Sequence, residues 1–63
     1  MTVQFHSYDL GVQYYEGSVV EQSYETAADY FWKAAQMGME EAREMYDQMI
    51  VDGLIPADYV PKE

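Results

Sequence analysis

The side chains in this sequence best suited to acid–base chemistry are His6 and Asp9, the only histidine–carboxylate pair at helical spacing. Catalysis by such a pair also needs a nucleophile or third group and an enclosing pocket. The chain has no cysteine, Ser7 and Ser18 lie in no recognisable motif, and Ser23 is explained by a helix-capping role. We therefore expect the protein not to be an enzyme and to have no catalytic residues, with His6 a partly buried or surface side chain.

Carboxylates are the other concentrated chemical group, and they raise the question of cation binding. Four of them fall in one short stretch: Glu40, Glu41, Glu44 and Asp47. No histidine lies nearby and the stretch has no loop of the kind that binds calcium, so we expect no metal site and no cofactor. A solvated helix face is the simpler interpretation, and the alternative is a surface that fits a basic groove. For that alternative we single out Glu40, Glu44 and, further upstream, Asp29.

The charge balance indicates what kind of partner the protein would meet. Twelve acidic residues face three basic ones, Lys33, Arg43 and Lys62, which gives a formal net charge of −9. Such a surface repels the phosphates of nucleic acids and of anionic lipids, so we expect no direct contact with nucleic acid or membranes. It favours a basic protein as the partner. The alternative is that the charge only keeps a small protein soluble.

The length bounds the stability of the fold. A chain of 63 residues forms one domain at most, and a domain of this size buries only roughly 60% of its unfolded surface. Because there is no cysteine to form disulfides, tight helix packing, oligomerisation or a bound partner must supply the stability. The N-terminal residues lack the features of a signal peptide and no apolar run could span a bilayer, so we expect a cytoplasmic protein.

Two consecutive segments have the pattern of an antiparallel helical hairpin. The first helix is expected over residues 23–37, with Ser23 as its N-cap and Gly38 in the left-handed position after its last turn. The second is expected over residues 39–52 and ends at Gly53. Their apolar stripes are Tyr24, Ala27, Ala28, Phe31, Ala34 and Ala35 in the first helix, and Ala42, Met45, Tyr46, Met49 and Ile50 in the second. The alanines permit a close approach of the two helices.

The N-terminal segment predicts a third helix, over residues 3–16, with two apolar stripes. One stripe is Val3, Leu10 and Tyr14, and the other is Phe5, Tyr8, Val12 and Tyr15. A helix with two apolar faces needs two neighbours, and the hairpin supplies only one, so we expect the second stripe to stay uncovered. The tail, residues 54–63, contains both prolines and is expected to be irregular, with Leu54, Ile55 or Tyr59 packed back on the core.

The chain also has a weak internal repeat. A shift of 36 residues places Gly17 on Gly53 and matches the apolar pattern of the helices before them, and such a period is typical of stacked helical hairpins. Residues 10–17, LGVQYYEG, are similar to the LGxxYxxG signature of the Sel-like repeats. Residues 23–38, SYETAADYFWKAAQMG, are similar to the signature DYxxAxxWYxKAAxxG of the same family.

The resemblance to the Sel-like repeats, relatives of the tetratricopeptide repeats, extends over residues 6–59, about one and a half repeats. It implies an all-α fold, a piece of an α-solenoid of three antiparallel helices that contacts other proteins and has no catalytic residues. The sequence departs from the family pattern at Asp47 and Ile50, where a small glycine and a tyrosine are usual, and at Val19. These departures imply looser packing of the last helix, or a terminal cap with a solvated outer face.

The function we expect is that of a protein–protein interaction module. The uncovered stripe of the first helix is the main candidate surface, for pairing two copies or binding a target. The alternative is that the segment is not one helix and that the tail covers these residues. Trp32 is a second candidate anchor, because an exposed aromatic ring buries a large area at a low entropic cost. The alternative for Trp32 is a ring folded over the helix edge against Tyr30 or the linker. Two other functions stay open: an acidic inhibitor, for instance phage-encoded, of a basic or nucleic-acid-binding host protein, and a homo-oligomer that stacks its repeats between chains.

Overall fold

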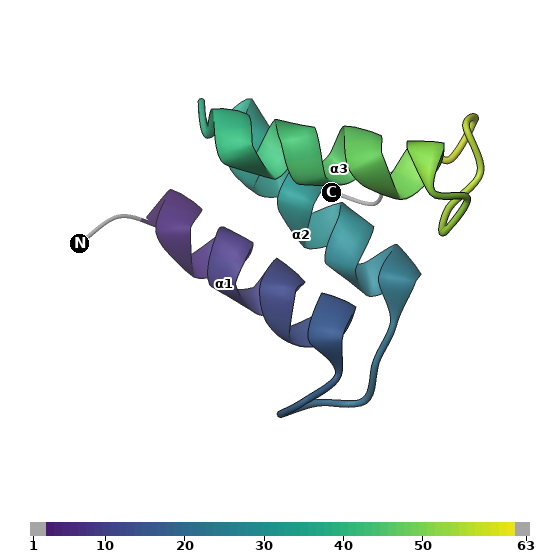
Figure 1. Ribbon diagram of the computed structural model, residues 1–63. Coiled ribbons are helices and arrows are strands. Elements are labelled where there is room, and N and C mark those ends of the chain that lie inside the picture. Colours follow the sequence, from purple (N-terminus) through teal and green to yellow (C-terminus); the bar gives the residue numbers. More distant parts are fainter. Residues whose placement is uncertain (1–2, 62–63) are drawn as a thin grey trace.

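The computed structural model describes residues 3–61, with side chains from residue 6 onward, and this part of the chain is all-α. Its three helices are α1 (Val3–Glu16), α2 (Tyr24–Gln36) and α3 (Glu40–Val51). Figure 1 shows α1 and α3 running in the same general direction on the near side of α2, which runs against both. Because α1 and α3 each pack on α2, the central helix carries the core, and the predicted three-helix antiparallel fold is confirmed.

Local chemistry sets the ends of the helices where the sequence predicts them. Ser23 has an extended backbone, and its Oγ accepts a hydrogen bond of 3.3 Å from the backbone N–H of Thr26, as an N-cap does. Gly38 and Gly53 follow the last turns of α2 and α3 with φ of 100° and 77°. Only glycine adopts this left-handed region without a steric cost, so these two residues end the helices.

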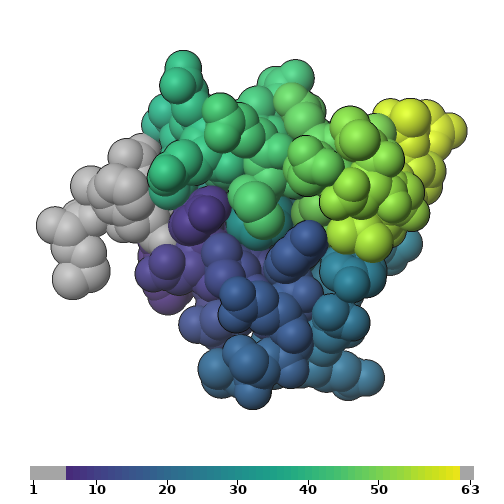
Figure 2. All heavy atoms as spheres, viewed as in Figure 1, coloured from purple at the N-terminus to yellow at the C-terminus, as the bar shows by residue number. Residues whose placement is uncertain are grey.

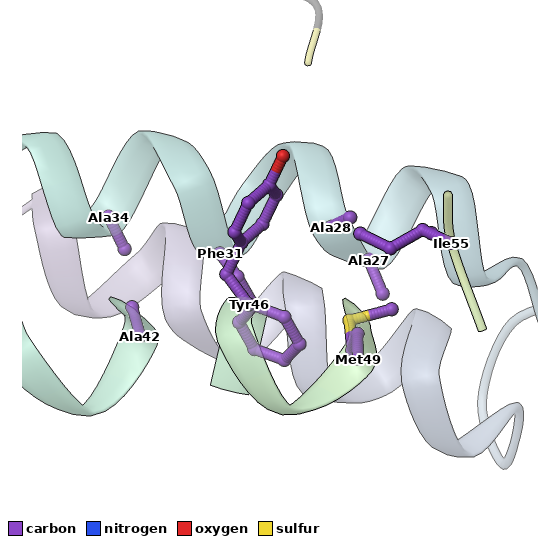
Figure 3. Packing of buried hydrophobic residues seen from close by; sticks show 8 residues of the cluster. All are labelled: Ala27, Ala28, Phe31, Ala34, Ala42, Tyr46, Met49 and Ile55. Carbon is purple, nitrogen blue, oxygen red and sulfur yellow. The ribbon is translucent and has the colours of Figure 1, made fainter. Parts of the chain in front are cut away.

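The buried core gathers on one side of α2 and is completed by α3 and the tail. Its members are Ala27, Ala28, Phe31, Ala34, Ala42, Tyr46, Met49 and Ile55. Figure 3 shows Ala34 of α2 facing Ala42 of α3, and both are fully buried. Two methyl groups at this crossing allow the two backbones to come close, as the alanine-rich stripe predicts.

The helix α1 approaches α2 along a line of small residues. Ser7 is only 4% exposed, and Gly11 lies directly against the ring of Phe31. Aromatic side chains flank this line on both sides: Tyr8 and Tyr15 lean towards Phe31, whereas Tyr14 stacks on Tyr30 with ring centroids 5.8 Å apart. Because Ser7 and Gly11 are small, the two helices come close enough for the aromatic side chains on both sides of this line to contact α2.

The tail after α3 packs back on the hairpin, as predicted. Ile55 is 3% exposed and belongs to the core, and Leu54 packs beside it. The Tyr46 hydroxyl donates to the backbone carbonyl of Tyr59 at 3.4 Å. The Tyr59 hydroxyl lies 2.8 Å from Asp29 Oδ1, to which it donates. These contacts fasten the tail to both α2 and α3.

Candidate functional site

A hollow of about 460 Å³ opens beside the turn that joins α2 to α3. The last turns of α2 form one wall and the first turn of α3 forms the other. The lining residues are Trp32, Ala35, Gln36, Gly38, Met39, Glu40 and Arg43. Trp32 and Glu40, two of the residues that the sequence singles out, therefore meet at one place. The hollow combines an aromatic ring, apolar side chains and charged groups, which is the composition of a binding site for a small group or a side chain.

Trp32 is half-buried and packs against the core. Its ring centroid lies 5.2 Å from that of Tyr46, with the two planes at 49°. The Trp32 ring therefore packs against another aromatic ring, as the alternative interpretation has it. The residue that it contacts is Tyr46 of α3, however, and not Tyr30 or the linker. Because Tyr46 is itself held by the hydrogen bond from its hydroxyl to the tail, the indole is fixed in position beside the hollow.

The charges at the hollow do not cancel. Arg43 Nε donates to Asp47 at 3.2 Å to Oδ1 and 3.3 Å to Oδ2, so this guanidinium is balanced by a carboxylate of its own helix. No hydrogen bond or ion pair engages the carboxylate of Glu40 within residues 6–61. Glu44 is also exposed but does not line the hollow. When Asp47, the partner of Arg43, is counted with Glu40, the surroundings of the hollow hold two carboxylates and one guanidinium, and the excess charge is negative.

Asp29 has a structural task in the described structure. It accepts the hydrogen bond from the Tyr59 hydroxyl, which also donates to the backbone carbonyl of Glu25 at 3.3 Å. Burial, followed by the hydrogen bond to Asp29, raises the pKa of Tyr59 above its ordinary value. Burial also raises the pKa of Tyr46, and the nearby charge of Asp29 adds to this effect. Asp29 thus belongs to the fastening of the tail, away from the hollow.

The stripe expected to be uncovered on α1 lies on the core side instead. The ring of Tyr8 is 5.6 Å from that of Phe31, and the ring of Tyr15 is 6.4 Å from it and 5.7 Å from that of Tyr24. Val12 also packs against the core. The expectation of an exposed stripe is therefore wrong for these three residues, because α1 meets α2 through Ser7 and Gly11. The side chain of Phe5 lies outside the described residues.

The face between α1 and α3 nevertheless keeps part of these side chains at the surface. Tyr8, Val12 and Tyr15 are half-buried. Figure 2 shows side chains from α1 and α3 meeting on this face. The hollow at the α2–α3 turn, which combines aromatic, apolar and charged side chains, is the better-defined site.

Sequence reasoning missed Gln36, Met39 and Arg43 as neighbours of Trp32 and Glu40. One signal was available: residues 32 and 36 on one helix, and 39 and 43 on the next, are spaced by four residues on either side of a short turn. Residues four apart share a helix face, so a hairpin brings the two pairs together at its closed end. Without the crossing geometry of α2 and α3, the depth of the hollow between them stays undetermined.

The other chemical candidates stay apart from the hollow. His6 and Asp9 are exposed on α1 and form no ion pair in the described structure. In residues 3–61, no group of three or more histidine, cysteine or acidic side chains converges as a metal site would require. No helix in the same range is long and apolar enough to cross a membrane.

The fold and the hollow together define a small three-helix, all-α domain with an acidic surface. No protein-family model matches the chain, and no match was found among curated proteins or solved structures.

Proposed function

We propose that this chain is a Sel-like protein–protein interaction module that binds a basic partner. The signatures at residues 10–17 and 23–38 support the family; the first covers the second half of α1, and the second covers α2. In this reading, Gly11 is the glycine of the first signature, and its contact with Phe31 gives that position a packing role. Helical hairpins of this kind present rigid faces, which suits binding without chemistry.

The observation that carries the proposal is the imbalance of charge on the surface. The chain has twelve acidic residues, and the described residues 3–61 contain a single ion pair, between Arg43 and Asp47. Glu40, Glu41 and Glu44 stand exposed on α3. A field of one sign steers a partner of the opposite sign and speeds its association. A basic protein is therefore the partner that this surface favours.

The outer face of α3 argues against stacking into a longer array. With the 36-residue shift, Ser7 and Gly11, which pack on α2, correspond to Arg43 and Asp47 of α3. Arg43 and Asp47 are paired with each other, and their side chains are 60% and 56% exposed. A further helix would have to bury this ion pair, which is costly. The proposal therefore favours a terminal unit over a homo-oligomer, and we expect a monomer by light scattering from micromolar to millimolar concentration.

The inhibitor interpretation stays open as a special case of the same function. The charge excess would let the protein occupy a basic surface that otherwise holds the phosphates of a nucleic acid. Its distinguishing result is competition: the protein would displace DNA from a basic nucleic-acid-binding protein, and the competition would fade as salt screens both contacts.

A pair of synthetic peptides tests the proposal directly. One is an amphipathic helix with lysines along its polar face, and the other is its counterpart with glutamates at the same positions. We expect the lysine peptide to bind by fluorescence anisotropy, with an affinity that falls as salt rises, and the glutamate peptide not to bind. Equal binding of both peptides, or binding of neither, would reject a charge-selective interaction module.

A further inference from the structure

We infer that the hollow at the α2–α3 turn receives a single cationic side chain, an arginine or lysine of the basic partner. This inference rests on the proposed function and adds to it the place of contact and the chemistry of the group that is bound. It is carried by three features of the hollow: the ring of Trp32, the apolar wall and the unbalanced carboxylate of Glu40.

The ring of Trp32 suits a cation because its π-face carries negative charge. Tryptophan is the aromatic residue that attracts ammonium and guanidinium groups most strongly. Its ring is supported by Tyr46 at 5.2 Å and so needs no rearrangement to receive a ligand. A ring already fixed in the free protein loses little entropy on binding. The indole therefore offers a preformed platform for a positive group.

The rest of the lining suits the stem of a long basic side chain. Ala35 and Met39 supply apolar surface, and Gly38 adds no side chain at the turn. Lysine and arginine carry three or four methylene groups below their charge, and they bury these stems along apolar surface while the charged head stays near water. A hollow that is open to solvent and only partly apolar fits such a side chain better than it fits a fully apolar one.

The electrostatics select a cation over an anion. Arg43 is the only basic residue that lines the hollow, and both carboxylate oxygens of Asp47 already accept hydrogen bonds from its Nε. The carboxylate of Glu40 has no such partner in residues 6–61. An incoming anion would meet the Glu40 carboxylate and an Arg43 guanidinium that already pairs with Asp47 through Nε, whereas an incoming cation would meet Glu40 and the Trp32 ring. At long range, the net charge of −9 likewise attracts cations and repels anions.

A matched pair of variants on α3 tests the inference with the lysine peptide. Glu40→Gln and Glu44→Gln remove the same charge from exposed positions one turn apart, but only Glu40 lines the hollow. We expect Glu40→Gln to weaken binding of the peptide about threefold, within the range of a partly solvated ion pair, and Glu44→Gln to weaken it clearly less. Trp32→Leu keeps an apolar side chain but removes the π-face, and we expect it to weaken binding about threefold as well.

The emission of Trp32 gives an independent readout, because it is the only tryptophan in the chain. Bound peptide should change its fluorescence in the unmodified protein, and circular dichroism of each variant checks that the helices are intact. If the peptide binds with no change in emission, and if Glu40→Gln and Glu44→Gln weaken it equally, the hollow is not the site and the proposed function stands. If the unmodified protein does not bind the lysine peptide at all, the proposed function fails, and the inference fails with it.

Discussion

The backbone of Gly11 and the ring of Phe31 lie in direct contact, and this contact fixes how α1 sits on α2. A Cβ atom at residue 11 would lie 2.8 Å from both Cδ1 and Cε1 of Phe31, and 3.3 Å from the carbonyl oxygen of Ala27. Phe31 itself is fully buried, with Tyr8 and Tyr15 against it. The absence of a side chain at Gly11 therefore leaves the space that the Phe31 ring occupies in the core.

Gly11→Ala should lower the free energy of unfolding by about 1–3 kcal/mol, because the added methyl group must push the Phe31 ring or the two backbones apart. This cost opposes the gain of up to about 1 kcal/mol that alanine brings to a helix interior. Urea unfolding followed by circular dichroism measures the difference. In a double-mutant cycle, Phe31→Leu should relieve part of the cost, since the smaller side chain leaves room. A Gly11→Ala variant more stable than the parent would show that the structure accommodates the added methyl group without a steric cost.

Ser23→Ala should destabilise the protein by about 1 kcal/mol, because the N–H of Thr26 loses the oxygen that caps α2. The cap is seen in the 3.3 Å hydrogen bond to Ser23 Oγ. Thermal unfolding compares this variant with Ser18→Ala, a matched change at an exposed residue of the linker. The control should stay within about 0.5 kcal/mol of the parent. Equal effects of the two changes would argue against a stabilising cap.

Ile55→Ala should cost about 2–5 kcal/mol, because it leaves a cavity in the core where the tail packs. Ile55 is 3% exposed, whereas Val60 in the same tail is 81% exposed. Val60→Ala is therefore the control, and it should leave the midpoint of urea unfolding nearly unchanged. If Ile55→Ala were as mild as Val60→Ala, the tail would be dispensable for the stability of the hairpin.

Tyr59→Phe should cost about 1–2 kcal/mol at neutral pH, because the hydroxyl loses its hydrogen bond to the Asp29 carboxylate. Tyr30→Phe is the control, since the Tyr30 hydroxyl makes no hydrogen bond in the described structure. Chemical unfolding at pH 7 compares the two variants. A larger loss for Tyr30→Phe would contradict the assigned role of Tyr59.

The same hydroxyl predicts a fall in stability at alkaline pH. The pKa of Tyr59 is raised in the folded protein, chiefly by burial, while a tyrosine in the unfolded chain titrates near its ordinary value of about 10. Below a pH of about 10, the protonated Tyr59 hydroxyl contributes its full stabilisation to the folded state. As pH rises above it, the unfolded chain releases the proton first, so stability is lost. Unfolding midpoints measured up to strongly alkaline pH should fall less steeply for Tyr59→Phe than for the parent. Identical slopes would contradict a proton held by the folded tail.

Local sequence was enough to predict the helices of this protein. The structure has α1 at Val3–Glu16, the bounds that the pattern of residues 3–16 predicts, and α2 and α3 begin and end within one residue of their predicted limits. The reason is that a capping serine, a glycine with positive φ and apolar residues three and four apart act through neighbours in the chain. The return of the tail onto the core could also be expected from its apolar residues, Leu54, Ile55 and Tyr59.

What only the tertiary structure decided is which side of each helix meets which neighbour. The sequence offers two apolar stripes on α1, but the contact with α2 runs between them, through Ser7 and Gly11, because only small residues let the helix backbones approach that closely. The expectation that the stripe of Tyr8, Val12 and Tyr15 stays uncovered is therefore wrong, because these side chains pack against the core. The meeting of Trp32 and Glu40 at one hollow depends equally on the crossing of α2 and α3. The crossing geometry of two helices is set by the packing of side chains that lie far apart in the sequence. The periodicity of apolar residues within one helix therefore does not predict it.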